Sequence, residues 1–328
     1  MSSHSEAPFS LRAIHFDSHG AREINSEKKV VEAWNEKEGI TWIHLVADDK
    51  PQSKIFLTAE LGLSELEVDD ALSEVDRVAF HDLAGWVFFS IPAIVLEEDD
   101  ERYIELGVFV FPHGLVSVSK SDCQVVGSIC QHVTTSHFAT SPSSTAILHL
   151  ILDAIVDEYF PAADRLQEAL ANLEDQIFEA NAALSVREGL GLKKRLLAFR
   201  KRVSPIREAI NALLRRDDLV APSLWPYFHD VYDHSLRLVE LADLGRDIFA
   251  SIMDAQLTIT SNRLNESMRF MTVVATILMS VTLIASVYGM NFKGMPEIDS
   301  PWGYPAAIVA MIVIGLAEWA AFRKKGWV

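Results

Sequence analysis

The sequence predicts an α+β domain, followed by long stalk helices and by two C-terminal transmembrane helices. Three observations support this fold class. Strand-like stretches occupy the first 140 of the 328 residues, helical periodicity extends over most of the remainder, and two uncharged apolar runs lie near the C-terminus. The composition also indicates two unlike parts, because a net charge of −17 occurs together with 49% hydrophobic residues and a mean hydropathy of +0.16.

The excess negative charge lies in the first four-fifths of the chain. Residues 263–328 contain six basic and four acidic residues, a net charge of +2, so residues 1–262 have a net charge of −19. Such an acidic surface repels phosphate groups, and we expect no nucleic acid among the partners. Cys123 and Cys130 are too few for a disulfide scaffold or a four-cysteine zinc site, so we expect two reduced thiols.

The first predicted domain, residues 1–140, is mixed α/β. A helix is expected at 64–74, with Ser64 as its N-cap and Glu67 completing a capping box. The acidic run 97–101 is expected to be a solvated hairpin tip, with a cation site as the alternative. Strand-like patterns predict five strands, at 10–16, 41–46, 86–94, 103–111 and 115–119.

A helical hairpin is expected at 141–223. Its first helix covers 145–183, with a kink at Pro161, and its second covers 186–215. The next helix has no Pro from residue 227 to residue 287 and a single Gly, Gly245. It is therefore expected to run without interruption for roughly 90 Å, first as a stalk (224–269) and then as a membrane span.

Two transmembrane helices are expected, at 270–292 and 303–323. The first apolar run has no charged residue across 23 positions, which corresponds to roughly 34 Å of helix and is enough to cross a bilayer. The alternative, a buried core helix, usually has a polar face. An external loop (293–302) joins the spans and a basic tail (324–328) follows them. Lys and Arg flank the outer ends of the pair, which predicts that both termini and the acidic domain face the cytoplasm.

Glu318 interrupts the second apolar run. An ionisable residue inside a membrane span usually has a function. Glu318 lies only five residues before Arg323, however, so we expect its side chain to reach towards the basic cluster at the membrane surface.

Polar and small residues recur at spacings of three and four along the last part of the long helix, so they share one stripe. The stripe is either a surface for helix packing or the lining of a pore, and the spacing does not choose between these. Two helices cannot enclose a water-filled path, so a pore would require an oligomer with its axis along the stripe. The stripe consists of Asp254, Thr258, Ser261, Asn265, Met268, Thr272, Ala275, Met279, Thr282 and Ser286.

The first span ends in Tyr288-Gly289-Met290-Asn291, the loop contains Met295-Pro296-Glu297, and the second span opens with Trp302-Gly303-Tyr304-Pro305. This combination of motifs resembles the CorA family of divalent-cation transporters. The signature of that family is a Gly-Met-Asn tripeptide between two C-terminal spans. Residues 227–234, Tyr-Phe-His-Asp-Val-Tyr-Asp-His, are similar to the start of its stalk helix. The resemblance is strong from about residue 225 onward and loose before it.

The resemblance implies a homopentamer in the inner membrane, surrounded by lipid, with the first span lining the pore. Gly289, Met290 and Asn291 would form the outer mouth. A ring of Asn side-chain carbonyls can accept hydrogen bonds from the water shell that Mg²⁺ releases reluctantly. The pore lining and its apolar gates would be formed by Asp254, Asn265, Met268, Met271, Thr272, Met279, Thr282 and Ser286.

The resemblance also implies cation sensing by acidic residues between neighbouring cytosolic domains. Asp230 matches the stalk position, Asp69 and Asp70 match the facing helix, and Asp157 or Glu158 is a further candidate. Bound divalent cations would relieve repulsion and hold a closed state. The alternative is that these are ordinary surface charges.

One charge in the external loop departs from the expected pattern. Lys293 lies next to the mouth and would repel cations unless Glu297 or Asp299 offsets it.

The transported and regulatory cation is expected to be Mg²⁺. The alternative is Zn²⁺, Ni²⁺ or Co²⁺, carried by a ZntB-like transporter with proton coupling. A hypothesis of another class is a membrane-anchored sensor or scaffold that conducts nothing. No enzyme and no cofactor are expected, because the sequence has no Walker A, Gly-x-Ser-x-Gly or His-Glu-x-x-His motif.

Overall fold

The structure is a computed structural model of the 328-residue chain. It describes residues 9–18, 20–47, 50–73, 78–83, 85–97, 101–135, 143–178, 182–290, 294 and 300–327. The chain divides into two compact units, Met1–Phe249 and Ala250–Val328, which are described separately below.

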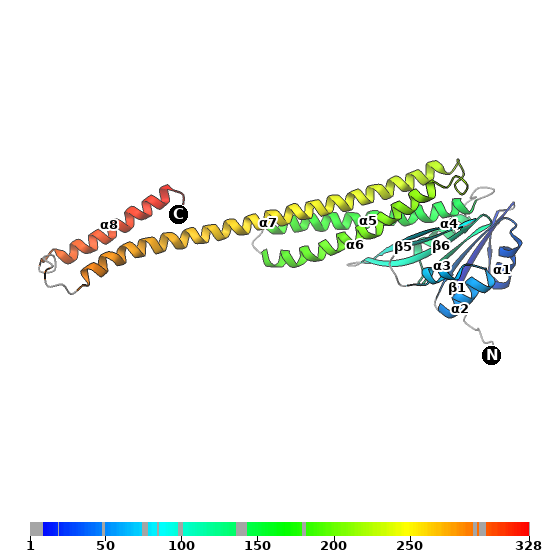
Figure 1. Ribbon diagram of the computed structural model, residues 1–328, viewed down its shortest axis with the longest axis horizontal. Coiled ribbons are helices and arrows are strands. Elements are labelled where there is room, and N and C mark those ends of the chain that lie inside the picture. The colour runs from blue at the N-terminus through cyan, green and yellow to red at the C-terminus, as the bar shows by residue number, and fades with distance from the viewer. Residues whose placement is uncertain are drawn as a thin grey trace. The chain divides into compact units, whose positions relative to one another are not determined.

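A seven-stranded sheet, counted over the described residues, forms the centre of the first unit (Figure 1). Its strand order is β2-β1-β3-β7-β6-β5-β4, and neighbouring strands are antiparallel except for the parallel pair β3 and β7. The five predicted strands are confirmed. The bounds are β1 Ser10–Asp17, β2 Gly20–Ile24, β3 Ile40–Val46, β4 Ala79–Leu83, β5 Trp86–Leu96, β6 Glu101–Phe111 and β7 Gly114–Ser119.

Helices cover both faces of the sheet. Three helices pack on one face: α1 (Glu27–Glu36), α2 (Lys50–Ile55), which continues into the π-helical turn η1 (Phe56–Glu60), and α3 (Glu65–Ala71). The other face carries α4 (Gln124–Thr135) and α5 (Ser144–Phe178). The inner strands β5 and β7 are therefore buried on both sides, and β5 consists of a nearly continuous apolar run.

Helix α3 begins at the predicted position but without the predicted capping box. Ser64 occupies the N-cap position, and its side chain makes no capping hydrogen bond. Glu67 is buried instead, with Oε1 3.5 Å from Nδ1 of His81 on β4. The capping-box prediction is wrong because Glu67 turns towards the sheet and not back to the start of its own helix.

A buried polar group links the parallel strands. Nε1 of Trp42 donates to Oγ of Ser117 at 3.0 Å, and Nδ1 of His44 forms a second hydrogen bond to that oxygen, also at 3.0 Å. Burial lowers the pKa of His44 to about 4, from an ordinary value of 6.5. There is therefore a pH range in which the imidazole of His44 is neutral in the folded chain but protonated in the unfolded chain.

This difference in pKa predicts acid sensitivity of the first unit. Between pH 6.5 and about 4 the unfolded state binds the extra proton, so stability falls as the pH drops through that window. For His44, the free energy of unfolding is lower by about 3 kcal/mol at the acidic end of this pH window. Tryptophan fluorescence during urea unfolding measures it. The variant His44→Gln should show a smaller decrease between neutral and acidic pH, and an unchanged decrease would contradict the assignment.

Long helices follow the sheet domain. Helix α5 runs through Pro161, and α6 spans Ala182–Leu214, so both helices of the predicted hairpin are present. Helix α7 extends over Trp225–Tyr288 without a break, as predicted. Gly245 permits a close approach, since a Cβ at this position would lie 2.9 Å from Cδ2 of Leu196 on α6 and 3.3 Å from Cδ1 of Leu170 on α5.

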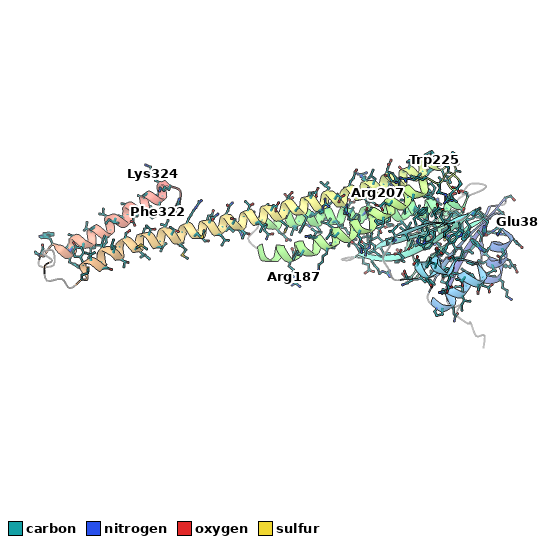
Figure 2. All side chains as sticks on the ribbon, in the orientation of Figure 1. Glu38, Arg187, Arg207, Trp225, Phe322 and Lys324 are labelled. Atoms are coloured by element: carbon teal, nitrogen blue, oxygen red, sulfur yellow. The ribbon has the colours of Figure 1, made fainter. Side chains whose placement is uncertain are left out.

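The second unit consists of the last part of α7 and helix α8 (Gly303–Lys324). Among the described residues, α7 and α8 are the two helices that are long and apolar enough to cross a membrane. Figure 2 shows the side chains along these helices, including Phe322 and Lys324 near the end of α8. Most of the large apolar side chains in this unit are exposed, which is the surface that a lipid-embedded helix presents.

Candidate functional site

Helix α8 covers one face of the apolar part of α7. Between residues 270 and 288, the side chains of α7 that are buried or half-buried all lie on this face. The two helices are in contact at Gly315 of α8, where an added Cβ would lie at an ordinary van der Waals distance of 3.7 Å from Cγ2 of Ile277. The covered residues of α7 are Val273, Thr276, Ile277, Ser280, Val281 and Ile284.

The polar stripe lies on nearly the opposite face of α7. At about 100° per residue, the centre of the stripe is roughly 150° from the centre of the covered face. All stripe members within this segment are exposed, and Met279 is 73% exposed. Within one chain, the stripe is therefore not the surface that packs against the second apolar helix. The exposed members are Met268, Thr272, Ala275, Met279, Thr282 and Ser286, and the gate candidate Met271 beside them is exposed as well.

Some hydroxyl groups of the stripe are satisfied by their own helix. Oγ1 of Thr272 donates to the carbonyl oxygen of Met268 at 2.8 Å, and Oγ1 of Thr258 donates to that of Asp254 at 2.9 Å. These residues need no partner outside α7, because the bond to the carbonyl four residues earlier replaces one. Asp254 and Asn265, further from the apolar segment, are exposed.

The predicted mouth begins where α7 ends. The backbone N–H of Gly289 donates to the carbonyl of Ala285 at 2.9 Å, and that of Met290 donates to the carbonyl of Val287 at 3.3 Å. These bonds satisfy carbonyls of the last turn and continue the helix to the motif. The remaining predicted residues of this region, Asn291, Lys293 and Glu297, lie outside the described residues.

A cluster of possible metal ligands lies in the first unit, where side chains of α5 and α7 meet. Asp153, Asp230 and His234 each place one ligand atom within 4.8 Å of the others. Asp157 is next to them, with Oδ1 3.4 Å from Nδ1 of His234. Burial raises the pKa of Asp153, and the neighbouring carboxylate of Asp157 raises it further.

The structure thus brings together two predicted residues, Asp157 and Asp230, and adds two more. Asp153 and Asp157 are four residues apart on α5, and Asp230 and His234 are four apart on α7, so each pair shares a helix face. The spacing of four residues in each pair is visible in the sequence and indicates that the two members lie close together. Glu158, the other candidate on α5, is exposed and lines a cavity of about 450 Å³ with Asp153 and His132.

The other predicted sensing residues, Asp69 and Asp70, lie on α3. Nζ of Lys54 is 2.7 Å from Oδ1 of Asp69 and 2.9 Å from Oε1 of Glu65. Hydrogen bonds that the Lys54 ammonium donates to these two carboxylates raise the pKa of Lys54. Asp70 lines a cavity of about 480 Å³ together with His81 and Ser90. Over the described part of the chain, neither aspartate joins the cluster around Asp230.

The chain combines an α+β domain with one long helix whose last part, together with α8, forms a pair of helices apolar enough to cross a membrane. The sequence model of the CorA-like Mg²⁺ transporter protein family matches residues 37–324, and the chain belongs to this family. It is thus a member of a family of divalent-cation transporters. The predicted family and fold class are confirmed.

Several proteins are similar to this chain. The cobalt/magnesium transport protein CorA of Thermotoga maritima is 37% identical over 182 residues, which is 55% of this chain and 52% of that protein. The protein of the same name from Methanocaldococcus jannaschii is 25% identical over 307 residues, 92% of this chain and 96% of that protein. The matched region therefore spans about half of the first relative and nearly all of the second.

Two solved structures show the same fold. The complete structure of the CorA magnesium transporter from Methanocaldococcus jannaschii has a TM-score of 0.82 and 23% identity, and covers 97% of this chain and 98% of its own. The ZntB cytoplasmic domain from Vibrio parahaemolyticus has a TM-score of 0.64 and 15% identity, and covers 78% of this chain and all of its own. At these sequence identities the similarity establishes the fold, and it does not establish which cation is transported.

Proposed function

We propose that the protein is a homopentameric Mg²⁺ channel or transporter of the inner membrane, with both termini in the cytoplasm. The observation that supports this most is the position of the polar stripe on α7. Helix α8 covers the opposite face, so the stripe is available to face a symmetry axis between five copies. A pair of helices from one chain cannot enclose water, whereas five stripes around an axis can.

The chemistry of the stripe fits the passage of a hydrated ion. In the proposed pentamer, Ser286, Thr282 and Thr272 offer hydroxyl oxygens to the water shell of the cation. Met279, Met271 and Met268 would form apolar rings between them, which close the path by excluding water. Asn265 and Asp254 would line the wider, cytosolic stretch, where a carboxylate ring favours cations.

At the outer end we assign ion selection to Gly289, Met290 and Asn291. Five amide oxygens of Asn291 would accept hydrogen bonds from the waters around Mg²⁺, so the ion would enter without losing its shell. The positive charge of Lys293 beside this ring opposes cation entry, and we propose that the negative charge of Glu297 offsets it.

We assign control of the gate to cytosolic divalent cations that bind at Asp157, Asp230 and their neighbours Asp153 and His234. In the pentamer, Asp69 and Asp70 of an adjacent copy would complete the sites. Each bound cation would offset part of the charge of −19 that each chain carries in residues 1–262. Occupied sites would therefore hold the copies together in a closed state, and loss of the cation would release them.

The second candidate cargo is Zn²⁺, Co²⁺ or Ni²⁺. One observation favours it: the cluster includes the imidazole of His234, a ligand that suits transition metals, whereas Mg²⁺ prefers oxygen ligands alone. Proton coupling, as expected for a ZntB-like transporter, would then accompany transport.

Uptake into proteoliposomes tests the proposed function. The purified protein should take up Mg²⁺ down its gradient, and Asn291→Ala should lower the rate at least about tenfold, because a lost hydrogen bond to a charged group costs about 1.5 kcal/mol or more. Asn262→Ala, which removes an exposed amide of α7 outside the stripe, is the matched control. Uptake of Zn²⁺ but not of Mg²⁺ favours the second candidate. No uptake of either ion favours a non-conducting sensor or scaffold.

A further inference from the structure

A hydrogen bond joins the two apolar helices of the second unit. Oγ of Ser280 on α7 donates to Oε1 of Glu318 on α8 at 2.6 Å. The prediction that Glu318 reaches to the basic cluster is wrong: its carboxyl turns to the neighbouring helix, and the guanidinium of Arg323 lies 5.2 Å from the centre of the Trp319 ring.

The serine in this bond differs from the threonines around it. Thr272 and Thr276 donate to the carbonyl oxygens of their own helix, each at 2.8 Å. Ser280 lies within the face of α7 that α8 covers, and its hydroxyl donates to Glu318 instead. Oε2 of Glu318 is enclosed and has no hydrogen-bond partner among the described residues. Among the described residues, the hydrogen-bond partner of this carboxyl is therefore Ser280.

We propose that Glu318 is a positioning residue that fixes the rotation of α7 about its own axis through Ser280. A stripe that lines a pore must face the axis to within a fraction of a turn. In lipid the hydrophobic effect favours no particular rotation of a helix, because lipid tails are as apolar as Leu side chains. A hydrogen bond in hydrocarbon does have direction, and water does not compete for it. The bond therefore holds the stripe, on the far side of α7, in a fixed direction. The inference rests on the proposed function where its test measures transport.

Four variants measured in proteoliposomes test the inference. Glu318→Leu and Ser280→Ala should each change the half-saturating Mg²⁺ concentration about threefold, the factor that corresponds to a typical interhelical hydrogen bond in a membrane. The double variant should show no larger change than either single one, since both remove one bond. Glu318→Gln keeps an oxygen that accepts from Ser280 and should restore the parent value. A Gln variant as altered as the Leu variant, or multiplicative effects in the double variant, would overturn the proposal.

Thr276→Val is the matched control. It removes a hydroxyl from the same covered face, but from a residue that bonds its own helix, so the half-saturating concentration should not change. A change as large as that of Ser280→Ala would mean that any polar loss on this face disturbs transport.

A crosslinking rate separates this inference from the proposed function, because it needs no transport. Ile277→Cys with Gly315→Cys places two thiols at a close contact between the helices. The native Cys123 and Cys130 are buried, and burial raises the pKa of both thiols, that of Cys130 to about 12, so they react slowly. Crosslinking should slow about threefold with Glu318→Leu and recover with Glu318→Gln. An unchanged rate refutes the positioning role, whereas absent transport in the parent refutes only the proposed function.

Discussion

Replacement of Met279 by serine should raise the flux through the resting protein at least about tenfold. The reason is that burial of a Met side chain contributes a free energy of roughly 1.5–3 kcal/mol in each copy, and serine loses this contribution. Met279 is 73% exposed in one chain and lies on the stripe. In the proposed pentamer its ring would exclude water and so block the ion. A hydroxyl in its place lets water and the hydrated cation remain there. Fluorescent dye in liposomes, with Mg²⁺ present on the side of the cytosolic domain so that the parent protein stays closed, reports the flux directly.

Leu278→Ser is the control for this prediction. Leu278 is the adjacent residue, is 59% exposed, and lies about 100° around the helix, off both the stripe and the face covered by α8. It should leave the resting flux near the parent value. Equal leaks from both variants would show that a serine anywhere in this segment disturbs the helix, and would remove Met279 from the gate.

Replacement of Asp230 by asparagine should raise the Mg²⁺ concentration that protects the protein from protease about tenfold, a coupling typical of regulatory sites. Asp230 supplies one of the clustered ligand atoms, and asparagine keeps the shape of the side chain without its charge. The same shift should appear in the Mg²⁺ concentration that inhibits uptake by half. Limited proteolysis across a Mg²⁺ titration measures the first quantity and vesicle flux measures the second.

Asp233→Asn is the control, because Asp233 is an exposed acid on the same turn of α7 and does not belong to the cluster. His234→Ala adds a test of the cation. If the imidazole binds metal, this variant weakens protection by Co²⁺ or Ni²⁺ more than protection by Mg²⁺. Identical titrations for Asp230→Asn and the parent would mean that the cluster is an ordinary set of surface charges.

The long helices and the apolar pair could be predicted because their signals are local and sustained. A run of 23 residues without charge or a helix without Pro needs no knowledge of its neighbours. The strands β2 and β4 were missed for the opposite reason. Each has five residues and lies at an edge of the sheet, where few side chains are buried and no apolar run marks the strand. Helices α1, α2 and α4 are short and were missed as well.

The candidate sites were predicted only in part, because they depend on which helix faces meet. The spacings within α5 and within α7 put Asp153 with Asp157 and Asp230 with His234. Nothing in those spacings says that the two pairs face each other. For Glu318, the nearest charge in the sequence suggested Arg323, whereas the observed partner, Ser280, is 38 residues away on another helix. The rotation of one helix against another depends on contacts between the helices, such as this hydrogen bond, and these contacts produce no periodic pattern in the sequence.

The parallel pairing of β3 with β7 has a consequence for synthesis of the chain. This central pair cannot form until β7 leaves the ribosome, so the sheet closes late relative to its own first strands. All seven described strands are nevertheless complete by Ser119, about 150 residues before the first apolar run. At about 5–20 residues per second, translation of that interval takes at least roughly 8 s. Mixed α/β domains fold within about milliseconds to seconds. The sheet therefore has time to fold during translation, before the membrane-inserting helices emerge.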